Sequence, residues 1–230
     1  MIDISRHVQA AYDQIVLAYA DRNHGTMADN LVALAERLVR HTGRGAHIID
    51  VGCGTGNLFP FVEDRFRRYV GVDAIRYDEF PLQAQFTPAD LNAAPWPLAD
   101  ECADAVVAVE TIEHLENPRA FVRELTRLAK PGGWIIVTTP NQLSLLSKMT
   151  LLFKNQFNAF QEGSYPAHLT ALLESDLRRI AGESGWEDVA VHYSGSGRVT
   201  MTSQRYPRFL SKAFPRAFSD NVLIMGRKAA

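Results

Sequence analysis

The segment 47–58 constrains the fold more than any other part of the chain. Three glycines spaced two residues apart, Gly52, Gly54 and Gly56, follow a short apolar run. Glycine adopts positive φ readily and leaves room for a ligand beside the backbone. A buried strand that turns sharply into a helix has this pattern. We therefore predict a ligand-binding turn at the carboxyl end of a strand, where open α/β sheets bind their ligands.

The acidic residue before these glycines narrows the choice of ligand. The dinucleotide fingerprint has the wider spacing Gly-x-Gly-x-x-Gly and places a pyrophosphate at a helix N-terminus. Here the spacing is tighter, and Asp50 would repel a pyrophosphate but suits a cationic or amine-bearing ligand. The run 49–56 closely resembles motif I of class I S-adenosylmethionine-dependent methyltransferases. That resemblance implies S-adenosylmethionine as cofactor, bound by Asp50, Gly52, Cys53, Gly54 and Gly56.

Composition is that of a single soluble domain. With 230 residues, 47% of them hydrophobic, the chain is long enough for one α/β domain spanning 1–230. Two cysteines form no disulfide framework and favour a cytoplasmic location. The net charge of −2 gives no overall attraction to nucleic acid, so we do not expect a nucleic-acid partner. No apolar run is long enough to span a bilayer.

The first 45 residues are predicted to form a helical cap. Apolar side chains recur at helical spacing between positions 7 and 40. In class I methyltransferases such leading helices lie over the cofactor and the substrate. By that resemblance Tyr19 is a substrate-pocket residue, whereas a plain core position is the alternative.

Two further acids follow the order that the family implies. The predicted strand 69–73 ends in Asp73 about twenty residues after the glycines, where a carboxylate can accept hydrogen bonds from both ribose hydroxyls. The segment 88–92 resembles the family's third motif. The resemblance implies that Asp90 accepts from the adenine amino group and that Leu91 packs on the ring, with an Asx-type turn as the alternative.

The remaining elements complete a doubly wound, Rossmann-like α/β fold. We predict a helix from the glycine turn to residues 65–68, a loop over 74–88 with a short strand at 85–86, and a helix from 118 to 129. Strands are predicted at 102–109, 134–139, 186–193 and 220–226, and a helix at 171–181. The resemblance implies a seven-stranded sheet whose last strand is antiparallel, with an apolar helical insertion after the fifth strand.

The second chemical cluster is Glu110-x-x-Glu113-His114, at the end of the predicted fourth strand. Glu110 is expected to lie beside the cofactor. His114 is the first candidate for a general base, with Glu113 beside it. Alternatively, Glu110, Glu113, His114 and the later His168 offer two carboxylates and two imidazoles, a set that suits Mg²⁺ or Mn²⁺. That set resembles the metal site of small-RNA 2′-O-methyltransferases, and its Glu-x-x-Glu-His part resembles ubiquinone-pathway O-methyltransferases. A purely structural role is the third possibility.

The segment 142–165 is apolar and follows the fifth predicted strand. We interpret it as a helical lid over the active-site rim, with Phe157 and His168 beside the substrate. A dimer surface and an interfacial membrane helix are the alternatives. Peripheral membrane contact, and the choice between a monomer and a homodimer, therefore stay open.

These observations favour an O-methyltransferase acting on a small hydroxylated or lipid- or sugar-linked metabolite. One alternative is a divalent-metal-dependent RNA 2′-O-methyltransferase. The other is a non-catalytic subunit that binds S-adenosylmethionine.

Overall fold

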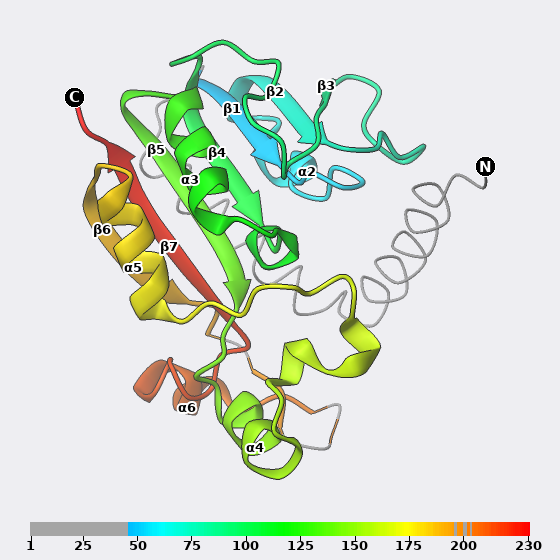
Figure 1. The fold of residues 1–230 in the computed structure, drawn as a ribbon, viewed down its shortest axis with the longest axis vertical. Helices are drawn as coiled ribbons and strands as arrows, with labels where there is room; N and C mark the ends of the chain where they lie inside the picture. The colour runs from blue at the N-terminus through cyan, green and yellow to red at the C-terminus, as the bar shows by residue number, and fades with distance from the viewer. Residues whose placement is uncertain (1–45, 196, 200–201, 203) are drawn as a thin grey trace.

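The computed structural model describes residues 46–195, 197–199, 202 and 204–230. Their core is one seven-stranded sheet in the order β3-β2-β1-β4-β5-β7-β6 (Figure 1). The strands are β1 (Ala46–Val51), β2 (Phe66–Asp73), β3 (Gln85–Pro88), β4 (Ala103–Val109), β5 (Ala129–Pro140), β6 (Trp186–Tyr193) and β7 (Asn221–Lys228). The predicted helical cap over 1–45, with Tyr19, lies outside the described residues.

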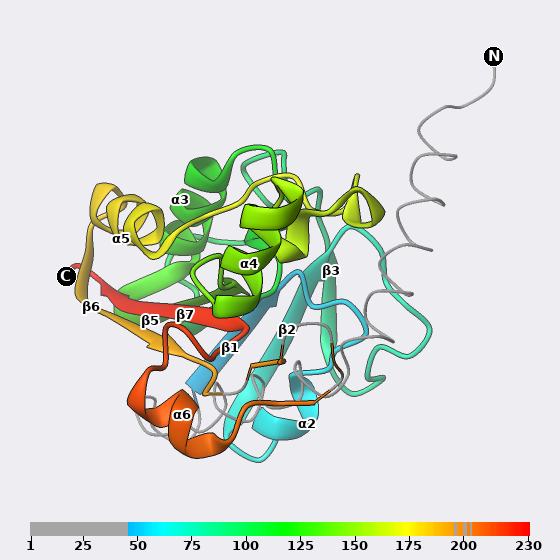
Figure 2. The same ribbon diagram turned by 90° about the horizontal axis from the view of Figure 1, so that it is seen from below.

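Helices flank this sheet on both sides. They are α2 (Phe59–Val62), α3 (Pro118–Leu128), α4 (Leu145–Lys154), α5 (Glu174–Glu183) and α6 (Arg208–Ala213), with single 3₁₀ turns η1 (Ile112–His114), η2 (Asn158–Phe160) and η3 (Glu162–Ser164). Figure 2 shows α3 and α5 on one side of the sheet, and α2 and α6 on the other. No described helix has the length and apolarity needed to cross a membrane.

The direction of the strands sets where a ligand can bind. Strands β1 to β5 pair in parallel, whereas β7 runs antiparallel to both β5 and β6. The predicted seven-stranded sheet with an antiparallel last strand is therefore confirmed. Because β1 and β4 are buried on both faces, their sequences are almost continuously apolar. Their carboxyl ends meet at one edge of the sheet, where chemistry-bearing loops gather.

Two hydrophobic clusters hold the layers together. On one side, α3 and α5 pack against the sheet through residues such as Phe121, Leu125 and Ile180, all nearly inaccessible to solvent. On the other side, Leu58, Tyr69 and Phe80 fill the space beside the glycine turn. Burial of each large apolar side chain contributes about 1.5–3 kcal/mol to folding before entropy costs.

Two predicted boundaries were wrong. The helix expected from the glycine turn to residues 65–68 is a single turn, α2, because the backbone enters β2 at Phe66, three residues before the predicted strand start. Phe66 is buried in the second cluster, and this tertiary packing overrides the local helical pattern. Strand β5 begins at Ala129 and includes the segment Lys130–Gly133, which we had expected only to end the preceding helix.

Replacing Gly52 by alanine is expected to lower the free energy of unfolding by about 3 kcal/mol. Gly52 has a φ of +73°, and an added Cβ would lie 2.2 Å from Thr111 Oγ1. Gly54→Ala is the matched control, because its φ is +51° but no atom of the described residues lies within 4 Å of the new Cβ. Its expected loss is about 1 kcal/mol. Urea titration of both variants without ligand measures the difference, and equal losses would contradict the packing of Thr111 against this turn.

Candidate active site

The glycine turn lies directly after β1 and is held in place by a hydrogen bond to the neighbouring strand β2. The Gly52 N–H donates to the Val72 carbonyl at 2.7 Å, which ties the turn to β2. Gly52, Gly54 and Gly56 all have positive φ. Side chains crowd the outer two, Thr111 at Gly52 and Pro81 at Gly56, whereas Gly54 faces open space. The turn therefore presents bare backbone at its centre, the surface that a ligand needs for close approach.

Asp73 lies beside this exposed backbone, and its contact with the ribose of the cofactor stays a prediction. Its Oδ2 accepts the Gly54 N–H at 2.9 Å, and its Oδ1 accepts the Ala74 N–H at 2.7 Å. A carboxylate has about four acceptor positions, so capacity remains for the hydroxyls of a ligand. Burial raises the pKa of Asp73, while these N–H groups and the nearby His114 lower it.

Asp50 and Cys53 lie beneath the turn rather than on its open side. Asp50 is 2% exposed and accepts a hydrogen bond from the Tyr69 hydroxyl. Burial raises the pKa of Asp50 to about 7, although the bond from Tyr69 opposes the shift. The buried Cys53 thiol has a raised pKa for the same reason. The predicted contact of these two residues with the cofactor stays a prediction.

Asp90 and Leu91 lie on the loop after β3. Asp90 is exposed, and its Oδ1 accepts the Asn92 N–H at 2.9 Å, which closes an Asx-type turn. The preceding Ala89 N–H donates to the Asp73 carbonyl at 2.9 Å, so this loop starts beside the predicted ribose acid. Leu91 is half-buried. The turn shows that the alternative interpretation of Asp90 holds locally, and its adenine contact remains a prediction.

Glu110 joins three strands instead of facing the other candidate metal ligands. Its carboxylate accepts from Thr138 Oγ1 at 2.7 Å on β5 and from the Asn221 amide on β7. The backbone at Glu110 is left-handed, with a φ of 50°. Burial raises the pKa of Glu110 well above its usual value, and the neighbouring Glu113 raises it further. Sequence reasoning missed Asn221, which lies 111 residues away and bears no motif.

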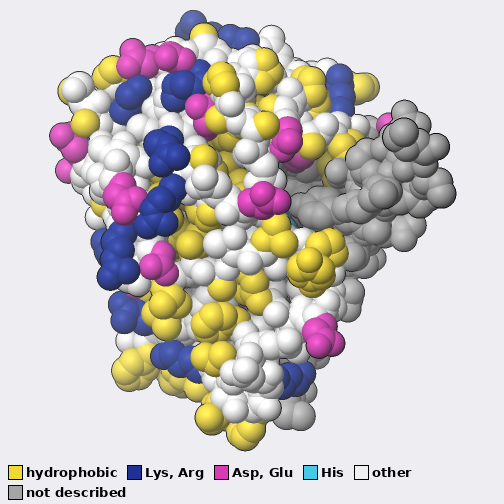
Figure 3. All heavy atoms as spheres, in the orientation of Figure 1, with side chains coloured by type: hydrophobic (Ala, Val, Ile, Leu, Met, Phe, Trp, Pro, Cys, Tyr) yellow, Lys and Arg dark blue, Asp and Glu magenta, His cyan; other side chains and the backbone are white. Residues whose placement is uncertain are grey.

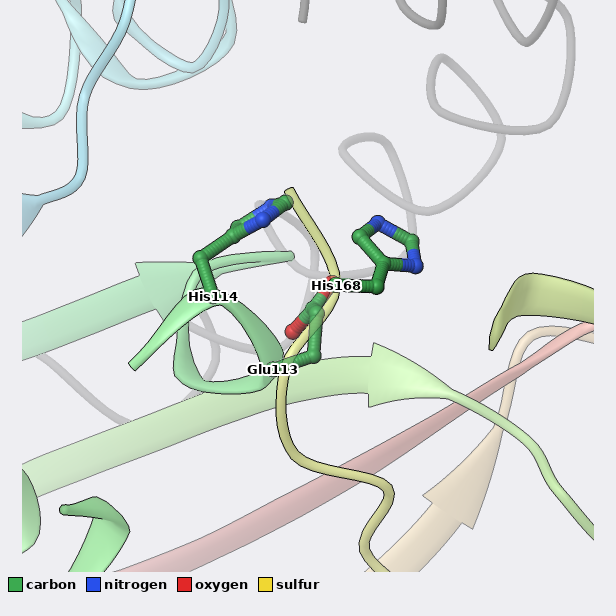
Figure 4. A group of neighbouring side chains, drawn as sticks. All are labelled: Glu113, His114 and His168. Carbon is green, nitrogen blue, oxygen red and sulfur yellow. The ribbon is translucent and has the colours of Figure 1, made fainter. Parts of the chain in front are cut away.

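Three of the four predicted metal ligands converge. Glu113, His114 and His168 each offer one ligand atom, and these atoms all lie within 4.8 Å of one another. Figure 4 shows the two imidazoles and the carboxylate gathered from η1 and from the segment before α5. The imidazole rings of His114 and His168 meet edge to face with centroids 4.8 Å apart. Glu110 is not part of this group, because its oxygens bind Thr138 and Asn221.

Only one of the two oxygens of the Glu113 carboxyl group has a hydrogen-bond partner among the described residues. Its Oε2 accepts from Thr139 Oγ1 at 3.0 Å. Its Oε1 is buried and has no hydrogen-bond partner among the described residues. Burial raises the pKa of Glu113 to about 8, with the Thr139 bond opposing the shift. A buried carboxyl oxygen without a donor is costly unless the group is protonated or a cation neutralises it.

Both histidines are held in their neutral form. Nδ1 of His114 lies 2.6 Å from the Ala167 carbonyl, and Nδ1 of His168 lies 2.5 Å from the Ala159 carbonyl. Burial lowers the pKa of His168 to about 4 and also lowers that of His114, although backbone carbonyls oppose both shifts. A neutral imidazole keeps a lone pair on one ring nitrogen, and anchoring the other nitrogen to a carbonyl is typical of metal-binding histidines.

The apolar segment after β5 contacts this cluster through Ala159 and Phe160. The Ala159 carbonyl binds His168, and the Phe160 ring lies 5.3 Å from the His168 ring. Phe157, the predicted substrate residue, is half-buried one residue before η2. Thr139 was also missed, although it ends the apolar run of β5 at the sheet edge where ligands bind.

The sheet order, the glycine turn and the acid after β2 together define a Rossmann-like enzyme that binds a nucleoside cofactor. Residues 19–191 match the family model described as a methyltransferase domain. The chain therefore belongs to the class I S-adenosylmethionine-dependent methyltransferases, and its cofactor is S-adenosylmethionine.

Known proteins agree with this assignment. A probable S-adenosylmethionine-dependent methyltransferase of Mycolicibacterium smegmatis is 30% identical over 187 residues, covering 78% of this chain and 68% of the relative. A ubiquinone biosynthesis O-methyltransferase of Chromobacterium violaceum is 32% identical over 150 residues, covering 61% of this chain and 64% of the relative. The chain thus spans about half to two thirds of the length of the curated relatives it matches. A Thermotoga maritima structure, described as a possible histamine N-methyltransferase, shares the fold with a TM-score of 0.66 at 16% identity, covering 96% of this chain and 99% of that chain.

Asp50→Asn is expected to flatten the pH dependence of stability. The pKa of Asp50 is about 7 in the folded protein against an ordinary value of 3.8, so the folded state binds more protons between these values. The stability that this proton contributes is present below about pH 4 and is lost as the pH rises through about 7, amounting to about 4 kcal/mol at most. Urea titrations across this range should show a smaller decline for the variant. An identical decline in both proteins would mean that Asp50 is ionised in the folded state.

Proposed function

We propose that this methyltransferase transfers the methyl group to a hydroxyl oxygen of a small molecule, at the site formed by Glu113, His114 and His168. The observation that carries the proposal is the convergence of these three side chains within 4.8 Å beside the glycine turn. Asp73 and His114 are near enough for each to shift the pKa of the other. The cofactor's binding edge and the cluster therefore belong to one site.

The residues of the turn fit the cofactor. Open space at Gly54 admits the ligand to the backbone, and Asp73 offers acceptors to its ribose. When bound, S-adenosylmethionine supplies an electrophilic methyl group on a sulfonium. The chain's own task is then to hold the acceptor in line and to deal with the acceptor's proton.

The cluster suits an oxygen acceptor because a hydroxyl must lose its proton as the bond forms. The neutral imidazoles can take up that proton near neutral pH, whereas the Glu113 carboxyl, with a pKa of about 8, is itself protonated there. Two imidazoles and one carboxylate are also a recognised set for a divalent cation with open positions. When bound there, Mn²⁺ or a similar ion would lower the pKa of a coordinated hydroxyl.

Two facts favour a small acceptor over RNA. Relatives that share up to 32% identity include enzymes named for O-methylation in ubiquinone biosynthesis. The net charge of −2 gives no general attraction to a polyanion. Transfer of labelled methyl groups to a panel of hydroxylated compounds, with shape-matched amines as controls, tests the acceptor class. Label in the amines alone would contradict the proposal.

Mn²⁺ alone is expected to bind the full-length protein at one site and to displace a proton from Glu113. Because the pKa of Glu113 is about 8, its carboxyl is protonated at neutral pH. The affinity should therefore rise about tenfold per pH unit up to about pH 8 and level off above it. Isothermal titration calorimetry in two buffers of different ionisation enthalpy measures both the affinity and the released proton.

Glu113→Gln and His168→Asn are expected to abolish this binding. Glu116→Gln is the matched control, because Glu116 is an exposed acid in the same loop. Loss of binding in the control, or Mn²⁺ binding that Glu113→Gln leaves intact, would contradict a metal role for the cluster.

A further inference from the structure

Helix α4 is rich in apolar side chains, but none of them is fully buried. Leu152 and Phe153 are 74% and 75% exposed, and Leu151 is also exposed. The helix's one buried residue is Ser147, a polar side chain. A helix in a soluble protein normally turns its apolar stripe towards a core. Among the described residues, α4 has no such core beneath its outer side chains.

Helix α6, about 60 residues later in the chain, also exposes its apolar side chains. Phe209 and Phe214 are 68% and 61% exposed, and Ser211 is the buried residue of this helix. Large exposed apolar side chains therefore occur on both helices, and groups of such side chains mark interaction sites.

The two helices lie at the same end of the molecule. Figure 1 shows both at the lower end, and Figure 2, seen from below, shows both facing the viewer. The Leu145 N–H donates to the Ala217 carbonyl at 2.7 Å, which joins the start of α4 to the segment after α6. We call the exposed side chains of these two helices, with Phe214 at the end of α6, the α4–α6 surface.

Cations without acids surround these apolar side chains. The sequence has no Asp or Glu in residues 141–161 or 189–219. Arg198 and Arg216 pair with Asp220 and Glu174. In contrast, four exposed cations on the two helices have no acidic partner among the described residues: Lys148, Lys154, Arg208 and Lys212. Figure 3 shows hydrophobic and basic side chains over this lower end, with most acidic side chains higher on the molecule.

We propose that the α4–α6 surface docks the protein on an anionic lipid bilayer. Leu152, Phe153 and Phe209 would enter the boundary between headgroups and acyl chains, while the cations contact lipid phosphates. Exposed aromatic and aliphatic side chains flanked by Lys and Arg are typical of interfacial helices. Each cation near an anionic surface strengthens binding about fivefold, and long Lys and Arg side chains reach headgroups while their stems stay apolar.

The docking surface is connected to the Glu113–His114–His168 cluster. The Asn158 N–H donates to Ser147 Oγ on α4 at 3.2 Å, and the next residue, Ala159, binds His168 through its carbonyl. A docked α4 therefore holds the rim of the cluster beside the bilayer, which favours an acceptor taken from the membrane. This last step rests on the proposed function, whereas docking itself does not.

Flotation of the full-length protein with phosphatidylglycerol-containing vesicles tests the proposal, with pure phosphatidylcholine vesicles in parallel. We expect binding to the anionic vesicles that weakens as salt is added. Leu152→Glu should lower the bound fraction at least about tenfold, because it removes an inserted side chain and adds a repelled charge. Leu82→Glu is the matched control: Leu82 is 90% exposed on the loop between β2 and β3, outside the surface, and should bind like the original protein.

A second variant, Arg208→Gln with Lys212→Gln, should lower binding to anionic vesicles by roughly tenfold or more and leave the melting temperature unchanged. Failure of the original protein to float would overturn the proposal, as would Leu152→Glu floating equally well. Sedimentation velocity adds one more outcome. A dimer that Leu152→Glu dissociates, with no vesicle binding, would make this surface a contact between copies of the chain and would also overturn it.

Discussion

The site depends on three acidic side chains gathered at one edge of a parallel sheet. Asp50 lies in β1, Glu110 and Glu113 follow β4, and burial raises the pKa of each. Such groups are tolerated only where donors or cations compensate for lost hydration. Tyr69 donates a hydrogen bond to Asp50, and Thr138 and Asn221 donate hydrogen bonds to Glu110. Glu113 has one donor, Thr139, and one buried oxygen without any. That imbalance distinguishes Glu113 from Asp50 and Glu110.

Much of the fold followed from the sequence because parallel strands buried on both faces leave an unmistakable pattern. The strands around Asp50, Asp73 and Val109 were predictable from apolar runs ending in acids or glycines. The convergence of His168 on His114, 54 residues apart, was anticipated only through a family resemblance. No local spacing could place an imidazole from a loop before α5 against one in η1.

The failures have a common physical cause. Glu110 was expected among the metal ligands. The antiparallel pairing of β5 with β7 instead places Asn221 opposite Pro140, where the Asn221 amide reaches the Glu110 carboxylate. Partners chosen by long-range register are invisible to motif reasoning. The predicted length of α2 was wrong for the same reason, because the packing of Phe66 into the second cluster ends the helix early. The predicted lid differs from these cases. The segment does form a helix, α4, near the site, but several of its apolar side chains are exposed to solvent.

We propose that Glu113, His114 and His168 together hold a divalent cation beside the cofactor. The most direct measurement is anomalous scattering from crystals grown with S-adenosylhomocysteine and Mn²⁺. We expect one strong peak about 2.0–2.3 Å from the carboxylate and both imidazoles. We also expect the nucleoside over Gly54 and beside Asp73. A bound nucleoside with no manganese peak at these three side chains, or with the peak at Glu110 instead, would contradict a cation site at Glu113, His114 and His168.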